Sequence, residues 1–125
     1  MRIAEFMQKN DIEMESRKAG RNPSMIDPFA GDHWRCELTC GSNSYVFHFS
    51  KGYGHKGKPP RIAEVFECFL SDYSFVDLSF DDFCSELGYD ASNKSRISYN
   101  VLQQQNKEVE NLFVNCFDDF LSLEF

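Results

Sequence analysis

The stretch Phe49-Ser-Lys-Gly-Tyr-Gly-His-Lys-Gly-Lys-Pro-Pro-Arg61 divides the chain into two parts of different character. Before it, apolar residues alternate with polar ones, which is typical of strands. After it, apolar residues recur at intervals of three and four, which is typical of helices. The stretch itself is rich in glycine and lysine. We therefore expect it to connect a sheet to a group of helices.

The length of 125 residues suits one domain with one hydrophobic core. We divide this single domain, residues 1–125, into a helix with strands at 1–50, a basic glycine-rich connector at 51–60 and an acidic helical part at 61–125. No apolar run approaches the roughly 18 residues that a membrane helix needs. We therefore expect a cytoplasmic protein that does not contact a membrane.

The first part of the chain predicts one helix and three strands. Residues 2–9 have the apolar spacing of a short amphipathic helix. The period changes to two in residues 12–20, 33–40 and 45–49, each of which predicts a strand. Residues 21–32 contain two prolines and are predicted to be a loop, and residues 41–43 a turn. The result is a three-stranded antiparallel sheet with one face covered.

Three helices are predicted after the connector, and we expect them to pack on one sheet face. The first begins near Pro60, since proline suits the first helical turn. Ser79 caps the second helix, which ends before Gly88, and Ser92 caps the third. The middle of the third helix, residues 103–108, is polar over nearly two turns, which favours exposure, a kink or a contact surface. The fold class is α+β.

The chain ends in an apolar segment for which two placements are open. The segment packs on the core, or it forms a contact in a homodimer or with a partner, because exposing it would be unfavourable. Its apolar residues are Phe117, Phe120, Leu121, Leu123 and Phe125.

The cysteines are expected to be buried thiols. Cys36 and Cys40 share one strand face, and the other three lie singly on apolar helical faces. Free cysteines tend to be buried, and zinc would require closely grouped ligand pairs. We expect neither a metal nor another cofactor.

The net charge of −7 hides an asymmetry. Residues 1–62 carry ten Lys/Arg against seven Asp/Glu, a sum of +3, and residues 63–125 carry three against thirteen, a sum of −10. Such an acidic helical part argues against nucleic-acid binding there and favours a basic protein partner. The alternative is an acidic surface that only maintains solubility.

Catalysis receives little support from the motifs. No Ser, Cys or carboxylate lies in a recognised nucleophile motif. His48 and Arg35 are expected on the outer sheet face, and with His33 they define the one enzymatic alternative, which would require a concave site. We expect a non-enzymatic protein.

The connector combines features of anion binding. Gly52, Gly54 and Gly57 free the backbone amides, and a helix start follows. The pattern is neither a P-loop nor a dinucleotide fingerprint. A polar joint between sheet and helices is one interpretation, and contact with nucleic acid or an acidic partner is the other. Tyr53 and the residues Lys51, His55, Lys56 and Lys58 would form this second surface.

A set of short motifs resembles small uncharacterised proteins encoded by bacteriophages and mobile elements. These motifs are His33-Trp-Arg35, Phe49-Ser-x-Gly-x-Gly-His-x-Gly57, Pro60, Val65-x-x-Cys-x-x-Ser-Asp72, Ser79-Phe-x-x-Phe-Cys84 and Leu87-Gly-Tyr-Asp-x-Ser-Asn-Lys94. The resemblance covers about residues 33–105 and implies an accessory phage gene, a class that includes anti-CRISPR proteins. It brings no catalytic or binding residues with it.

The resemblance and the charge together suggest an inhibitor that acts in the host cytoplasm. It would bind a host defence protein, a CRISPR nuclease or surveillance complex, and cover a basic nucleic-acid-binding surface. The expected acidic contact comprises Asp72, Asp77, Asp81, Asp82, Glu86 and Asp90. The alternative is a nucleic-acid-binding module that uses residues 51–58.

Overall fold

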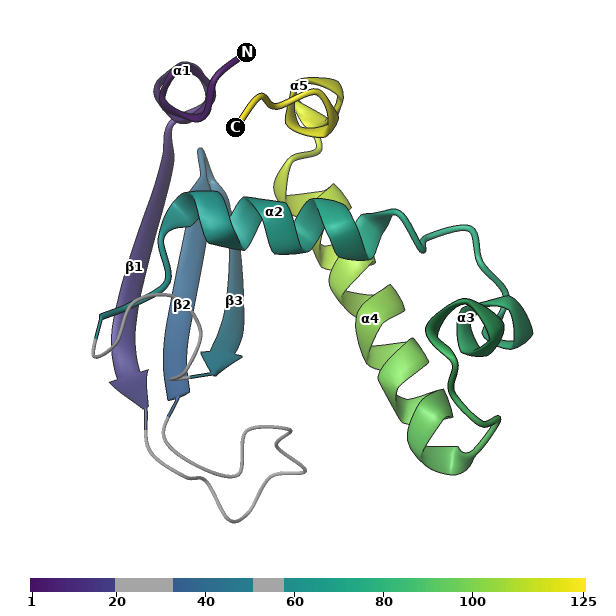
Figure 1. The fold of residues 1–125 in the computed structure, drawn as a ribbon. Helices are drawn as coiled ribbons and strands as arrows, with labels where there is room; N and C mark the ends of the chain where they lie inside the picture. The colour runs from purple at the N-terminus through teal and green to yellow at the C-terminus, as the bar shows by residue number, and fades with distance from the viewer. Residues whose placement is uncertain (20–32, 51–57) are drawn as a thin grey trace.

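The computed structural model describes residues 1–19, 33–50 and 58–125. The predicted α+β fold is confirmed: a short helix precedes a three-stranded antiparallel sheet, and helices follow (Figure 1). The predicted loop at 21–32 and most of the connector lie outside the described residues. The elements are α1 (Ile3–Lys9), β1 (Ile12–Ala19), β2 (His33–Cys40), β3 (Asn43–Ser50), α2 (Ile62–Tyr73), α3 (Phe80–Leu87), α4 (Asn93–Leu112) and α5 (Phe117–Leu121).

The sheet has the order β1-β2-β3, and both neighbouring pairs are antiparallel. Cys40 pairs with Asn43, so Gly41 and Ser42 form a two-residue hairpin loop. Gly41 has a φ of +60°, which tight hairpin turns require and which glycine adopts without strain. The register places Met14, Leu38 and Tyr45 side by side on the face that the helices cover.

Four phenylalanine rings form the centre of the core. Phe6, Phe66, Phe113 and Phe120 have almost no exposed surface. All six ring pairs among them have centroids between 4.5 and 6.1 Å apart, mostly edge to face. Such pairs add about 0.5–1.5 kcal/mol each to the gain from burial. This Phe cluster joins α1, α2, the end of α4 and α5.

The two chain ends lie close together in the fold (Figure 1). The amide of Glu124 donates to the carbonyl of Met1 at 3.0 Å, and Arg2 pairs with Glu124 in a short parallel bridge. In the apolar end segment, Phe120 and Leu123 are buried, so this part packs on the core as one expectation had it. Leu121 and Phe125 remain about half exposed.

The bounds and packing of the helices differ in part from what the sequence pattern indicates. The last predicted helix is divided, because α4 ends at Leu112 and α5 begins at Phe117. α3 packs against α4 and lies away from the sheet, at the far side of the molecule (Figure 1). α3 is therefore attached to the sheet only through its neighbours.

Of the three alternatives for residues 103–108, exposure holds for residues 104 and 107, while Gln103 and Asn106 make contacts within the molecule. Gln103 Nε2 donates to the carbonyl of Phe75 at 2.8 Å, and Asn106 Nδ2 donates to that of Asp72 at 3.1 Å. Asn106 is only 1% exposed. The sequence pattern showed the polarity but not the partners, which lie about 30 residues earlier in the chain.

A third contact extends this arrangement. Tyr99 Oη donates to the carbonyl of Leu78. Tyr99, Gln103 and Asn106 follow one another along one side of α4, because residues three and four apart share a helix face. Their acceptors belong to the end of α2 and the link to α3. The acceptors run antiparallel to the donors along the chain, since the donors at 99, 103 and 106 bond to the carbonyls at 78, 75 and 72. We call these three side chains and their acceptors the carbonyl ladder.

The Phe cluster predicts that the end segment contributes strongly to stability. Phe120→Ala should lower the free energy of unfolding by about 3–5 kcal/mol, because it leaves a cavity among three rings. The neighbouring half-exposed Leu121→Ala should cost about 1 kcal/mol or less. Urea denaturation followed by circular dichroism measures both. Equal, small effects would mean that α5 is not part of the folded core.

The carbonyl ladder predicts a large effect from one buried amide. Asn106→Leu keeps the volume but removes the donor to Asp72, so it should destabilise the protein by about 1–3 kcal/mol. Gln104→Leu, at an exposed position two residues earlier, is the matched control and should change stability by about 0.5 kcal/mol or less. Thermal unfolding of both variants tests this, and equal stability of the two would contradict the role of the ladder.

Candidate functional site

α3 begins and ends at the capping residues that the sequence predicts. Ser79 is the N-cap, and its Oγ accepts a hydrogen bond from the amide of Asp82 at 3.2 Å. Asp81 and Asp82 lie in the first turn, where negative charge interacts favourably with the helix dipole. Gly88 ends the helix in the left-handed conformation with a φ of +70°. Both the predicted cap and the predicted terminator are confirmed.

Aromatic packing fixes the orientation of α3. Phe83 is buried, and its ring centroid lies 5.2 Å from that of Tyr99 on α4 and 6.4 Å from that of Phe75. Cys84 is buried beside it. Because these residues occupy one side of the helix, the acids at 81, 82 and 86 fall on the other side by helical periodicity.

Five of the six predicted contact acids are exposed around α3. We call them the α3 acidic surface: Asp77, Asp81, Asp82, Glu86 and Asp90. Within residues 1–19, 33–50 and 58–125, none of these five carboxylates forms an ion pair. Within this part of the chain, solvent, salt and the nearby cations of residues 94 and 96 therefore compensate their charge without a direct ion pair.

The sixth acid, Asp72, occupies a different environment. Asp72 on α2 is half-buried, and its Oδ2 accepts a hydrogen bond from Gln105 Nε2 at 2.7 Å. Burial raises its pKa above the usual range, and the hydrogen bond from Gln105 opposes this. Burial, Glu108 and Asp72 together raise the pKa of the nearby Tyr45 to about 12. Asp72 thus belongs to the packing between α2 and α4, not to the α3 acidic surface.

Two cations moderate the α3 acidic surface. Residues 77–96 carry five Asp/Glu and two Lys/Arg, which leaves a charge of −3. The guanidinium of Arg96 stacks over the ring of Phe80, 3.9 Å from its centroid, and a cation–π contact of this kind holds the side chain at the edge of α3. The surface is acidic with a basic rim.

Only one residue of the predicted second surface lies in the described part of the chain. Lys58 is exposed, while Lys51, His55 and Lys56 are outside the described residues.

Arg35 and His48 face each other across β2 and β3, and Arg17 pairs with Arg35 from β1. The sequence had singled out Arg35 and His48 but missed Arg17, because only the strand register reveals it.

The residues of the enzymatic alternative do come together. His33 and His48 have ring centroids 4.8 Å apart, and Arg35 is the cross-strand partner of His48. His33 is buried, whereas His48 is exposed. Among the described residues, no group of three or more His, Cys, Asp or Glu side chains is placed to hold a metal ion.

A shallow depression follows the outer side of α2. Its lining includes Glu64, Glu67, Cys68, Ser71 and Asp72. Glu64 is paired with Arg61 at 2.7 Å.

Of the helices in the described ranges, none is both long enough and apolar enough to cross a membrane.

The pKa of Asp72 predicts how stability depends on pH. A carboxyl whose pKa is higher in the folded state destabilises the fold as pH rises through that pKa, since the charged form is then buried. Asp72→Asn keeps an acceptor for Gln105 but cannot ionise. The variant should therefore gain stability relative to the wild type as pH rises from about 3 to 7, starting below the usual Asp pKa of about 3.9. Urea titrations at both pH values test this, and a constant difference would contradict it.

Comparison of the chain with protein-family models, with curated proteins and with solved structures gives no match. The proposals below therefore rest on the residues and contacts of this chain and on the motif resemblance.

Proposed function

We propose that this chain is a non-enzymatic inhibitor that binds a basic surface of a host defence protein through the α3 acidic surface. The observation that carries the proposal is a set of five exposed carboxylates around one short, firmly capped helix. The target class is a CRISPR nuclease or surveillance complex, as for an anti-CRISPR protein. Its nucleic-acid-binding groove would supply the complementary charge.

The electrostatics of α3 suit competition with a phosphate backbone. Exposed carboxylates on a rigid helix attract the same Lys and Arg side chains that bind phosphates. Opposite charge also speeds the encounter of two proteins. A partner whose groove is occupied by α3 could not accept nucleic acid at the same time.

The motif resemblance supports this target class through the residues that build α3. Ser79 caps the helix, Phe83 and Cys84 anchor it to α4, and Gly88 ends it. Ser92 then caps α4 by accepting from the amide of Ser95. The motifs that resemble phage-encoded proteins include Ser79, Phe83, Cys84, Gly88 and Ser92. These motifs therefore correspond to the scaffold that presents the acidic surface.

The proposal predicts that neutralising the α3 acidic surface weakens inhibition. Replacing its five acids by Asn or Gln should weaken inhibition of DNA cleavage by about tenfold or more, since an exposed ion pair contributes about 0.2–1 kcal/mol. The matched control replaces five other exposed acids in the same way. These are Glu5, Glu13, Glu15, Glu67 and Asp118.

The assay uses a panel of purified, guide-loaded CRISPR nucleases and surveillance complexes, with cleavage of a labelled DNA target as the readout. The wild type and the control should inhibit at least one complex at similar concentrations, and the α3 variant should need about tenfold more protein or fail to inhibit. An equal loss in both variants would indicate a net-charge effect without a defined contact. No inhibition by the wild type across the panel would reject the target class.

A second candidate function is nucleic-acid binding at the outer sheet face, where Arg17 and Arg35 lie beside Glu15 and Glu37. Arg17, Arg35 and His48 form a row across the sheet near the ends of β1 and β3, where residues 51–58 continue the chain. Cations in a row can bind a phosphate backbone. This candidate predicts binding of labelled DNA or RNA that weakens steeply with salt. Fluorescence anisotropy should show the binding lost when Lys51, Lys56 and Lys58 become alanine.

A further inference from the structure

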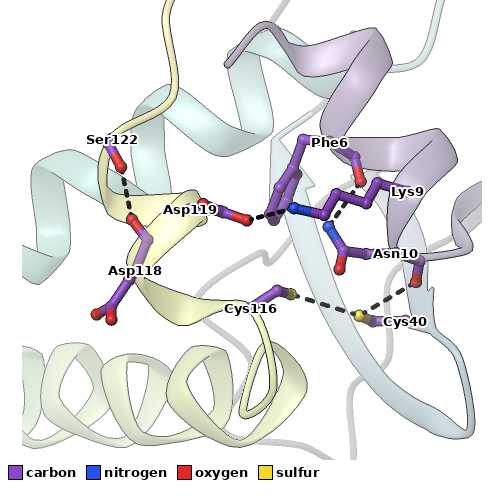
Figure 2. A network of polar contacts seen from close by, with 8 residues as sticks. All are labelled: Phe6, Lys9, Asn10, Cys40, Cys116, Asp118, Asp119 and Ser122. Carbon is purple, nitrogen blue, oxygen red and sulfur yellow. Dashed lines mark hydrogen bonds and ion pairs between the residues drawn. The ribbon is translucent and has the colours of Figure 1, made fainter.

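Two thiols that are far apart in the sequence meet beneath α5. The Sγ atoms of Cys40, the last residue of β2, and Cys116, between α4 and α5, are 3.9 Å apart (Figure 2). The Cys40 thiol also lies 3.6 Å from the carbonyl oxygen of Asn10 and can donate to it. All five cysteines of the chain are free thiols.

The two sulfurs are close enough that side-chain rotation could bring them to bonding distance. A disulfide needs a sulfur separation of about 2.0 Å, so the two atoms have to approach by roughly 2 Å. Cys40 precedes the glycine of the hairpin turn, and Cys116 lies outside a helix interior with a φ of −144°. Cys40 is paired with Ile12 and Asn43, and the backbone of Cys116 bonds to Phe113 and Phe120, so the two sulfurs would approach mainly by rotation of the two side chains.

Two of the other cysteines have surroundings that do not favour this reaction. Cys36 has no exposed surface, and its Sγ accepts a hydrogen bond from Ser16 at 3.3 Å. Cys84 is buried in α3, which lies on the far side of the molecule from α5 (Figure 1). Cys40, in contrast, is partly exposed, so a small oxidant can reach it.

We propose that Cys40 and Cys116 form a reversible intramolecular disulfide when the protein meets a low-molecular-weight disulfide such as glutathione disulfide. The Cys40 thiol loses its proton, and its thiolate attacks one sulfur of glutathione disulfide. That S–S bond breaks, and one glutathione leaves as a thiolate that takes up a proton. Cys116 then loses its proton and attacks the Cys40 sulfur, which releases the second glutathione and completes the protein disulfide.

The surroundings of the pair determine how fast this exchange runs. Burial raises the pKa of Cys40, the hydrogen bond with Cys116 opposes this rise, and the carboxylate of Asp11 adds to it. Burial, Cys40 and Asp119 raise that of Cys116 to about 12, while Lys9 opposes the rise. Because the thiolate is the nucleophile, the reaction should be slow at neutral pH and faster at higher pH.

The disulfide would fasten the end segment to the sheet. In the reduced protein, α5 is held by the buried Phe120 and by an exposed ion pair of 3.4 Å between Lys9 and Asp119 (Figure 2). A bond from Cys40 to Cys116 would close a long loop and restrict the unfolded chain. Because the pair lies far from α3, this inference does not depend on the proposed function.

The test treats the reduced full-length chain with glutathione disulfide at pH values from 7 to 9. Remaining thiols are blocked with N-ethylmaleimide, and mass spectrometry of proteolytic fragments identifies the linkage. We expect one linked fragment pair, Cys40 with Cys116, that forms faster as pH rises and disappears with dithiothreitol. The midpoint of thermal unfolding should rise by about 10 °C in the oxidised protein.

Single variants separate this pair from general oxidation. Cys40→Ser and Cys116→Ser should each abolish the linked fragment and the thermal shift, and Cys68→Ser should retain both. The fragment analysis of the wild type remains decisive if a variant does not fold. Glutathione on Cys40 without a protein disulfide, a linkage to another cysteine or to a second chain, or an unchanged thermal midpoint would overturn the proposal.

Discussion

The Phe cluster is the interaction on which the remaining structure depends. Its four rings come from α1, α2, the end of α4 and α5, so one cluster joins both chain ends to the two longest helices. Without Phe6 and Phe120, neither short terminal helix would have enough buried surface to stay folded, because isolated helices of this length are unstable in water. The sheet is covered only because these helices are held in place.

The carbonyl ladder extends this order beyond the core. In the link between α2 and α3, the carbonyls of Asp72 and Phe75 accept turn hydrogen bonds from the amides of Phe75 and Leu78. Tyr99, Gln103 and Asn106 add side-chain donors to the carbonyls of Leu78, Phe75 and Asp72 from one side of α4. α3 can therefore project from the core and still keep a defined position, which a surface used for recognition requires.

Features set by neighbouring residues could be predicted from the sequence, and features set by distant contacts could not. The strands, the hairpin at Gly41, the Ser79 cap and the Gly88 terminator follow from local patterns. The exposed acids at 81, 82 and 86 also follow, since they oppose the apolar side of α3. Asp72 was grouped with them because its half-buried position depends on Gln105, which is 33 residues away. Arg17 and the Cys40–Cys116 pair likewise depend on strand register and tertiary packing.

Two chemically different parts of the fold lie near opposite ends of α4. The thiol pair and the chain ends lie beside the Phe cluster, and the α3 acidic surface lies at the other end of α4 (Figure 1). α4 is a helix of 20 residues between them, and it spans about 30 Å at 1.5 Å per residue. Charges at α3 and thiols near α5 are also farther apart than the Debye length of about 8 Å at physiological salt. The proposed recognition through α3 and the proposed oxidation near α5 therefore involve separate parts of the fold.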